Sequence, residues 1–362
     1  MDLKLTSLVK EHEKLGAKMA PFGGWLMPIS YTGIIAEHEW TRQSVSLFDI
    51  CHMGEFIIYG RPEETNLDKI LTVNLAQMQC GNCRYGFLLN EEGTMVDDLV
   101  VYKLADDKWM LVTNAACIDK DENHLKKYLF AKAKLENVSE KTAKLDLQGP
   151  LSREVLKALV EEKIDGLKFY NFNFFKLLGE KIIISRTGYT GELGYELYIT
   201  VKKTKNLWSL LLENKKVKPA GLGARDTLRL EMGYSLYGQD VDENTTPIEA
   251  GLEHFVDFNK DFIGKQRLME RKKENFSKRR VYLKTDSRRS PRHNYKIYDG
   301  EKKIGLVTSG AFSPTLSCGI GMGYVTGERE KLDFKILLKN DKIQIPGYLV
   351  EKPFYKKSSL KK

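Results

Sequence analysis

Two adjacent carboxylates lie inside an otherwise apolar stretch of the chain. Asp97 and Asp98 belong to the run from Met95 to Leu104, whose β-branched and aromatic residues predict a strand. Because successive side chains of a strand point to opposite faces, one of the two aspartates must share a face with apolar residues. A carboxyl group in such surroundings tends to have a raised pKa, which suits it to accept a proton or to stabilise a cation.

Alternation along this strand places Asp98 on the same face as Tyr102 and Asp97 on the opposite face. A second interpretation stays open. In it the pair merely begins the strand from the turn at Glu92-Gly93, and both carboxylates are solvated.

Two glycine-rich stretches follow further along the chain. Gly188, Gly191 and Gly194 predict a bent loop whose backbone lies close to another group, followed by a strand in which Glu196 and Tyr198 share a face.

The second stretch is Gly221-Leu-Gly-Ala-Arg-Asp226, which lacks the third glycine and the preceding strand of a dinucleotide-binding site. Asp226 is predicted to begin a helix with Arg225 just outside it. The Arg225 guanidinium is then either solvated or bound to a carboxylate.

Short helices and strands must position these residues. Alternation and turn signals predict helices at 3–15, 33–43, 62–72, 119–133 and 152–160, and strands at 84–89, 95–104, 109–113, 143–148, 171–178, 181–186 and 195–199. Residues 46–59 are expected to run into a strand, with His52 and Met53 at the junction. The glycine- and proline-rich residues 21–31 are expected to form a loop, and 272–280 a basic linker. From residue 281 onward, short strands alternate with turns, which is typical of a small β-barrel or sandwich.

Length and composition indicate a globular protein of two or three domains, with 362 residues of which 42% are hydrophobic. No apolar run is long enough to cross a membrane, and the start Met-Asp-Leu-Lys lacks a signal peptide, so we expect a cytoplasmic protein. Five cysteines without framework spacing fit a reducing compartment. Cys80-Gly-Asn-Cys83 is interpreted as a turn, because no second ligand pair accompanies it.

The net charge of +9 could attract nucleic acid or an acidic protein. No stacking-aromatic motif or zinc-finger spacing accompanies the lysines, so the acidic protein is the favoured partner and nucleic acid is not expected.

The chain resembles the glycine cleavage system T-protein family, the aminomethyltransferases, from end to end. Ten motifs carry the resemblance: Phe22-Gly-Gly-Trp25, Phe48-Asp-Ile-Cys-His-Met-Gly54, Val96-Asp-Asp-Leu99, Gln148-Gly-Pro150, Arg186-Thr-Gly-Tyr-Thr-Gly-Glu192, Gly221-Leu-Gly-Ala-Arg-Asp226, Tyr237-Gly238, Asn259-Lys-Asp-Phe-Ile-Gly-Lys265, Thr308-Ser-Gly310 and Lys352-Pro-Phe-Tyr355.

The resemblance implies an α+β fold, a three-domain cloverleaf around a central folate pocket with a C-terminal β-barrel. The expected division is 1–51 with 143–243, then 52–142 with 244–275, then 276–362 as the barrel. The implied protein is a monomer that needs no metal.

The resemblance also implies a reaction: release of ammonia from the aminomethyl-dihydrolipoyl arm of the H-protein, and transfer of the one-carbon unit to tetrahydrofolate as 5,10-methylenetetrahydrofolate. By position in the motifs, Asp98 is the expected catalytic residue. The expected folate contacts are Met53, Tyr85, Tyr102, Asn114, Tyr189, Glu196, Arg225, Tyr234 and Lys361. Some relatives place an arginine of the C-terminal tail at the pocket, and Lys361 is the nearest match to it in this sequence. The single ammonium of a lysine would then replace a guanidinium that can donate two parallel hydrogen bonds.

Two related functions are alternatives. The folate-binding protein of iron–sulfur cluster assembly carries a cysteine motif, and the corresponding residues 260–266 here contain no cysteine. A demethylase of the sarcosine type would need a flavin domain, for which 362 residues leave no room.

Overall fold

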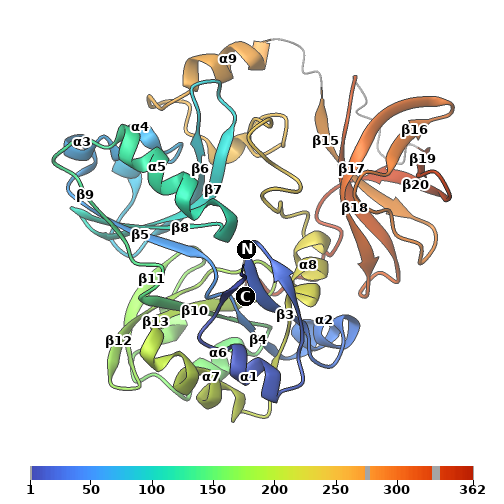
Figure 1. Cartoon of the computed structure of the whole chain (residues 1–362). Helices are drawn as coiled ribbons and strands as arrows, with labels where there is room; N and C mark the ends of the chain where they lie inside the picture. The colour runs from blue at the N-terminus through green and yellow to red at the C-terminus, as the bar shows by residue number, and fades with distance from the viewer. Residues whose placement is uncertain (1, 274–277, 328–334, 362) are drawn as a thin grey trace. The chain divides into compact units, whose positions relative to one another are not determined.

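The computed structural model describes residues 2–273, 278–327 and 335–361 (Figure 1). The chain divides into two compact units. One comprises Met1–Gly86, Asp98–Asp226 and Ser358–Lys362, and the other Phe87–Asp97 and Thr227–Lys357. The mixture of helices and strands confirms the expected α+β class. The three-domain division at the boundaries expected from the sequence stays a prediction.

The helices are short and separate the strands along most of the chain. They are α1 (Val9–Lys14), α2 (Ile34–Gln43), α3 (Pro62–Thr65), α4 (Leu67–Ile70), α5 (Ile118–Tyr128), α6 (Ser152–Lys157), α7 (Thr204–Leu212), α8 (Leu222–Glu231) and α9 (Lys265–Lys273). The strands up to residue 219 are β1 (Lys4–Leu5), β2 (Lys18–Phe22), β3 (Trp25–Ser30), β4 (Val45–Asp49), β5 (Gly54–Tyr59), β6 (Cys83–Leu89), β7 (Met95–Ala105), β8 (Lys108–Thr113), β9 (Lys134–Asn137), β10 (Thr142–Gln148), β11 (Phe172–Leu177), β12 (Glu180–Ser185), β13 (Gly194–Thr200) and β14 (Val217–Pro219). None of the helices in the described part of the chain has the length and apolar character that a membrane crossing requires.

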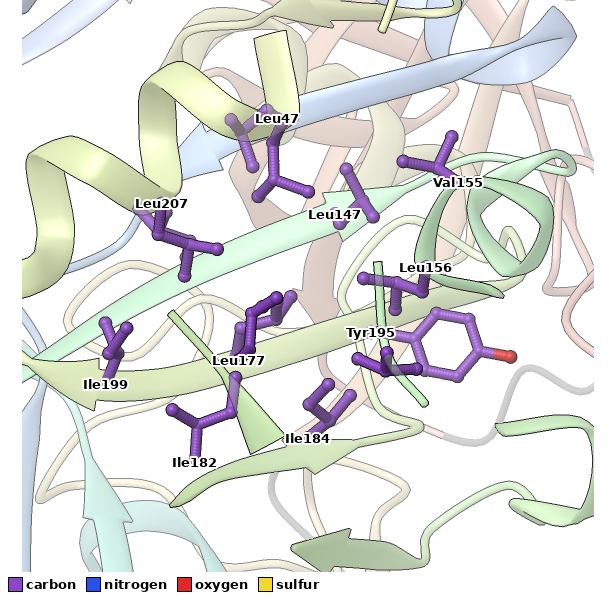
Figure 2. Packing of buried hydrophobic residues seen from close by; sticks show 14 of the residues in the cluster. Leu47, Leu147, Val155, Leu156, Leu177, Ile182, Ile184, Tyr195, Ile199 and Leu207 are labelled. Atoms are coloured by element: carbon purple, nitrogen blue, oxygen red, sulfur yellow. The ribbon is translucent and has the colours of Figure 1, made fainter. Parts of the chain in front are cut away.

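A six-stranded sheet in the first unit has the order β11-β12-β13-β10-β4-β14. One face carries an extensive apolar core, in which Leu147 of β10 and Ile184 of β12 are fully buried. Helices α6 and α7 cover this face with Val155, Leu156 and Leu207, as Figure 2 shows. Burial of this apolar surface stabilises the sheet and fixes its register.

The other face of the same sheet is polar and also buried. In β10 the side chains of Lys144, Asp146 and Gln148 alternate with the core leucines, and each of the three is at most 2% exposed. The antiparallel pairing with β13 sets Asp146 opposite Glu196 and Lys144 opposite Tyr198. Because strand alternation sends these polar side chains away from the leucines, one strand supplies both a core and a buried polar layer.

A five-stranded sheet, of order β6-β7-β8-β5-β9, lies in the middle third of the sequence. Its buried residues Ile57, Tyr102 and Val112 form one apolar cluster with Phe172 and Tyr198 of the six-stranded sheet. This cluster is an apolar core shared by these two sheets.

The second unit contains a closed six-stranded barrel of order β15-β18-β17-β16-β19-β20, whose strands are orange to red in Figure 1. The strands are β15 (Arg279–Thr285), β16 (Lys296–Asp299), β17 (Lys302–Ser313), β18 (Cys318–Val325), β19 (Lys335–Lys339) and β20 (Gln344–Val350). Pairing of β20 with β15 closes the barrel around a core that includes Leu283, Ile297 and Leu338. The expected C-terminal β-barrel is confirmed.

Several local predictions differ from the structure. The helix expected at 3–15 begins only at Val9, because Lys4–Leu5 form the strand β1. The helix expected at 62–72 is divided into α3 and α4 at Asn66, whose φ is 66°.

Residues 21–31 are not a loop, because β2 and β3 form an antiparallel hairpin in which Phe22 pairs with Trp25 next to the turn. Gly23 and Gly24 make its turn with φ of 55° and 85°, values that glycine adopts without strain. The expected linker at 272–280 begins inside α9 and ends in β15, and its residues 274–277 lie outside the described part of the chain.

Candidate functional site

Asp98 is held through both of its carboxylate oxygens. Tyr85 Oη donates a hydrogen bond to Asp98 Oδ2 at 2.9 Å, and Asn114 Nδ2 donates to Asp98 Oδ1 at 3.1 Å. The side chains come from adjacent parts of one sheet, since Tyr85 lies in β6, Asp98 in β7 and Asn114 directly after β8. Asp98 stays partly exposed. The carboxylate is therefore oriented by its neighbours and still accessible.

Asp97 has a different environment, because its side chain is fully buried. The interpretation in which both aspartates are solvated is wrong. The strand continues through both residues, and its alternation gives the two carboxylates opposite directions, as expected.

Tyr85 keeps its phenolic proton and so remains a hydrogen-bond donor to Asp98. Burial, followed by the charge of Asp98, raises the pKa of the Tyr85 phenol well above its usual value, with smaller contributions from Tyr189 and Tyr170. The hydroxyl thus keeps its proton throughout the neutral range. Its electrostatic coupling to Tyr189 also connects the Asp98 group with the glycine-rich loop at 186–193.

The group to which this loop lies close is the side-chain amide of Gln148. A Cβ atom added at Gly188 or at Gly194 would come within 2.3 Å or 2.1 Å of Gln148 Nε2, so any other residue at either position would displace the Gln148 amide. Gln148 Nε2 donates to Thr187 O at 3.1 Å, and Thr190 Oγ1 donates to Gln148 Oε1 at 2.7 Å. The same Nε2 donates to Asp146 Oδ1 at 2.5 Å, which links the loop to β10.

Arg225 is bound to a carboxylate, the second of the two alternatives left by the sequence. Its Nη1 donates to Asp146 Oδ2, and Asp146 is fully buried. The guanidinium also lies 5.0 Å from the Tyr189 ring centroid and 5.9 Å from that of Phe48. Burial raises the pKa of Asp146 to about 6 although the charge of Arg225 opposes this shift.

The predicted start of the helix near Arg225 was wrong. Helix α8 begins at Leu222, so Arg225 and Asp226 both lie inside it. The first turn follows Gly221, whose backbone N–H donates to Glu37 Oε2 at 2.8 Å. A Cβ atom at Gly221 would come within 2.3 Å of the Ile29 carbonyl, so the glycine serves a close approach of two backbones that local capping rules do not reveal.

Glu196 is buried and bound at both oxygens. Thr187 Oγ1 donates to Oε2 at 2.6 Å, and Lys144 Nζ lies 3.1 Å from Oε1. The same Lys144 Nζ is 3.6 Å from Met53 Sδ. Burial acts to raise the pKa of Glu196, but Lys144, Thr187 and Arg225 outweigh it and lower the pKa below its ordinary value.

The structure places three further predicted folate contacts, Tyr102, Tyr234 and Lys361, in three different environments. Tyr102 is fully buried, and its hydroxyl is 2.7 Å from Tyr198 Oη and 3.1 Å from Ser185 Oγ. Tyr234 belongs to the second unit, where its carbonyl oxygen accepts a hydrogen bond from Arg229 Nη1 at 2.9 Å. Lys361 is exposed.

The tail before Lys361 is attached to the glycine-rich loop. Ser359 Oγ donates to Glu192 Oε2 and accepts a hydrogen bond from Leu193 N at 2.9 Å. Arg186 Nη2 donates to Leu360 O at 3.0 Å. The C-terminal residues therefore complete the hydrogen bonding of the loop that carries Tyr189.

Comparison with known proteins decides the family. The model described as GCVT N-terminal domain matches residues 8–260, and the model described as Glycine cleavage T-protein C-terminal barrel domain matches residues 278–356. The chain belongs to the glycine cleavage T-protein family. The resemblance found in the sequence motifs is thus confirmed.

Relatives of the T-protein family match almost the whole chain. Aminomethyltransferase of Halothermothrix orenii is 45% identical over 356 residues, which are 97% of this chain and 100% of the relative. Aminomethyltransferase of Thermotoga neapolitana is 41% identical over 367 residues, with 98% and 99% covered. The crystal structure of glycine cleavage system aminomethyltransferase T from Bartonella henselae superimposes with a TM-score of 0.92 at 34% identity, covering 98% of each chain. The chain is an aminomethyltransferase of the glycine cleavage system.

Sequence reasoning missed the buried partners of this T-protein site. Lys144 and Asp146 compensate the charges of Glu196 and Arg225, and Glu55 of β5 is buried beside them. A signal was present, because charged or amide side chains alternate with leucines along β10. Alternation is usually interpreted as one buried and one solvated face, whereas here both faces are buried. Among the described residues, no group of three His, Cys, Asp or Glu side chains could hold a metal ion.

Proposed function

We propose that Asp98 is the catalytic carboxylate of the aminomethyl transfer. The observation that carries this proposal is the position of Asp98 between the Tyr85 hydroxyl and the Asn114 amide, with its side chain partly exposed. Hydrogen bonds at both oxygens keep the carboxylate in one orientation, which reduces the rearrangement needed during the reaction.

The chemistry proposed for Asp98 has two parts. The substrate is the aminomethyl group on the dihydrolipoyl arm of the H-protein, and loss of ammonia from it leaves a cationic carbon that is still bonded to the sulfur of the arm. A carboxylate stabilises this developing cation. The carbon then bonds to both reacting nitrogens of tetrahydrofolate while its bond to sulfur breaks and the arm leaves as a thiol. Each nitrogen loses its proton, one ending on the thiol and one on ammonia, and Asp98 can accept the proton of the anilinic nitrogen.

Tetrahydrofolate is the proposed one-carbon acceptor, and both partly exposed and buried residues are its proposed contacts. Glu196, bound by Lys144 and Thr187, has the acceptor capacity to take hydrogen bonds from the donor-rich edge of the pterin. Tyr189, with Arg225 against its ring, offers an aromatic surface. The other proposed contacts are Met53, Tyr85, Tyr102, Asn114, Tyr234 and Lys361.

Arg225, an expected folate contact, already uses one of its nitrogens to bind Asp146. Its charge is compensated by Asp146, so an acidic part of the substrate would have to share the guanidinium with that carboxylate. We propose that the remaining donors of Arg225 contact the ligand by hydrogen bonding.

The proposed partner is the lipoylated H-protein, which the net charge of +9 would attract if it is acidic. We propose that the protein acts as a monomer in the cytoplasm. The five free cysteines support a reducing compartment.

The test is formation of 5,10-methylenetetrahydrofolate when purified protein is mixed with aminomethylated H-protein and tetrahydrofolate. Asp98→Asn should abolish most of the activity, and Asp107→Asn, an exposed aspartate after the same strand, should retain it. A parent protein that forms no product above the uncatalysed rate would contradict the proposal.

A further inference from the structure

Lys144 is a buried ammonium on the polar face of the six-stranded sheet. Its side chain is only 2% exposed, and its Nζ lies 3.1 Å from Glu196 Oε1 and 5.2 Å from the Tyr198 ring centroid. A buried lysine loses its hydration, so its charge must be compensated within the protein. Glu196 supplies the compensating carboxylate.

The second oxygen of Glu196 is held by a chain of hydroxyl groups. Thr187 Oγ1 donates to Glu196 Oε2 at 2.6 Å and is itself 2.7 Å from Ser185 Oγ. Ser185 Oγ is in turn 3.1 Å from the Tyr102 hydroxyl. The carboxylate thus has one charged and one neutral partner, and each of its oxygens retains a lone pair for a further donor.

Other ionisable groups face Glu196 from several elements. They are Glu55 of β5, Cys83 of β6, Tyr102 of β7, Asp146 of β10, Tyr198 of β13 and Arg225 of α8. Glu55 is 1% exposed, and its Oε2 atom has no hydrogen-bond partner among the described residues. Burial raises the pKa of Glu55 to about 8, so this carboxyl is mostly uncharged near pH 7. Glu196, whose pKa is lowered, is the charged member of this pair of carboxyl groups. The positive charge of Lys144 therefore compensates the charge of Glu196 and not that of Glu55.

We infer that Lys144 is a positioning residue of the folate site, which holds the Glu196 carboxylate in place as an anion so that it can accept hydrogen bonds from the bound ligand. This inference rests on the proposed function, in which Glu196 contacts tetrahydrofolate. Lys144 acts through Glu196, and its contact with Met53 Sδ at 3.6 Å extends the same support to a second proposed folate contact.

A double-mutant cycle tests the inference. The dissociation constant for tetrahydrofolate is measured without H-protein for the parent, Lys144→Met, Glu196→Gln and the double variant. Lys144→Met should weaken binding about tenfold, the scale of a lost charge-assisted hydrogen bond, and should add less than about twofold when Glu196 is already Gln. In turnover, Lys144→Met should raise KM for tetrahydrofolate and leave kcat within about threefold.

The matched control is Lys176→Met, which removes an exposed lysine from β11 of the same sheet and should leave the dissociation constant unchanged. Thermal melts report folding of every variant. If Lys144→Met fails to fold, Lys144→Gln, which keeps a donor without a charge, takes its place in the cycle.

The results separate the inference from the proposal beneath it. If Glu196→Gln binds tetrahydrofolate as tightly as the parent does, Glu196 is not a folate contact. The proposed contact and the role of Lys144 are then both overturned. If Glu196→Gln weakens binding but loss of Lys144 does not, or if loss of Lys144 weakens binding equally in both backgrounds, only the inference about Lys144 is overturned.

Discussion

Asn114 binds Asp98 twice. Its Nδ2 atom donates to the main-chain carbonyl oxygen of Asp98 at 3.0 Å and to the side-chain Oδ1 at 3.1 Å. Asn114 follows β8 and Asp98 lies in the neighbouring β7, so one amide ties the catalytic candidate to the adjacent strand both through its backbone and through its carboxylate. A group fixed in this way loses little freedom when a ligand binds.

Replacement of Asp98 by Asn should lower turnover by about 10² to 10⁴, the scale of a lost proton-transfer group, and should retain much of the folate affinity. The amide has nearly the same shape but neither accepts the proton nor compensates a cation. Asp97→Asn should affect turnover much less, although Asp97 is buried and its replacement can lower the melting temperature. Initial rates and melts of both variants check this, and a reversed pattern would contradict the roles assigned to the two residues.

Tyr85→Phe should lower kcat by about tenfold while the protein stays folded, because it removes one hydrogen bond to a charged group. Asn114→Ala should have an effect of similar size, since it frees the other carboxylate oxygen. Each variant should matter far less when Asp98 is already Asn, because both act on that carboxylate. Rates of the single and double variants measure this coupling, and additive losses would show that Tyr85 and Asn114 act elsewhere.

Glu55 should make the protein less stable as pH rises. Burial raises its pKa from 4.5 to about 8, so the folded state binds the proton more tightly than the unfolded state does. The free energy of unfolding therefore falls between about pH 4.5 and pH 8, by on the order of a few kcal/mol from this group. Glu55→Gln should shift the urea midpoint upward at pH 8 and little at pH 5. The exposed Glu140→Gln is the control, and an equal shift at both pH values for Glu55→Gln would refute the role given to the proton.

Ser359→Ala should loosen the glycine-rich loop, because Ser359 Oγ binds both Glu192 and the amide of Leu193. Faster hydrogen exchange at Leu193 N–H and a folate affinity lowered by about threefold to tenfold are expected.

Lys361→Ala should cost folate binding about 1 kcal/mol or less, as expected of an exposed charge. Complete loss of folate binding in Lys361→Ala would instead make this lysine a main ligand contact.

The affinity for H-protein should weaken as salt rises, because the chain carries a net charge of +9 and surface charges are screened by ions. Affinity for tetrahydrofolate should change less, since the charges near Glu196 and Arg225 are largely buried and paired. Titrations of both ligands at two ionic strengths make the comparison. The same salt dependence for both ligands would argue against electrostatic docking.

Much of the fold could be predicted from local pattern. The strand around Asp98, the hairpin about Gly179 and the barrel strands after residue 278 follow from alternation and turn residues, which act over a few positions. The hairpin at Gly23-Gly24 was missed because glycine and proline indicate a turn without showing that the flanking residues pair.

The candidate site was only partly predictable. The motifs singled out Asp98, Glu196 and Arg225, but the partners of the last two come from β10, whose role depends on what packs against each face. No local rule reports that the polar side chains of a strand are buried. The start of α8 was missed for a similar reason, since Gly221 lies directly against the backbone of Ile29, which is distant in the sequence.

The attachment of residues 358–360 to the glycine-rich loop has a consequence for how the protein is made. These residues are synthesised more than 160 positions after the loop that they bind. Domains form while the ribosome is still adding residues, so the sheets can assemble during translation. The loop that carries Tyr189 can obtain these hydrogen bonds only after residues 358–360 have left the ribosome, so removal of these distant residues would act on folate binding.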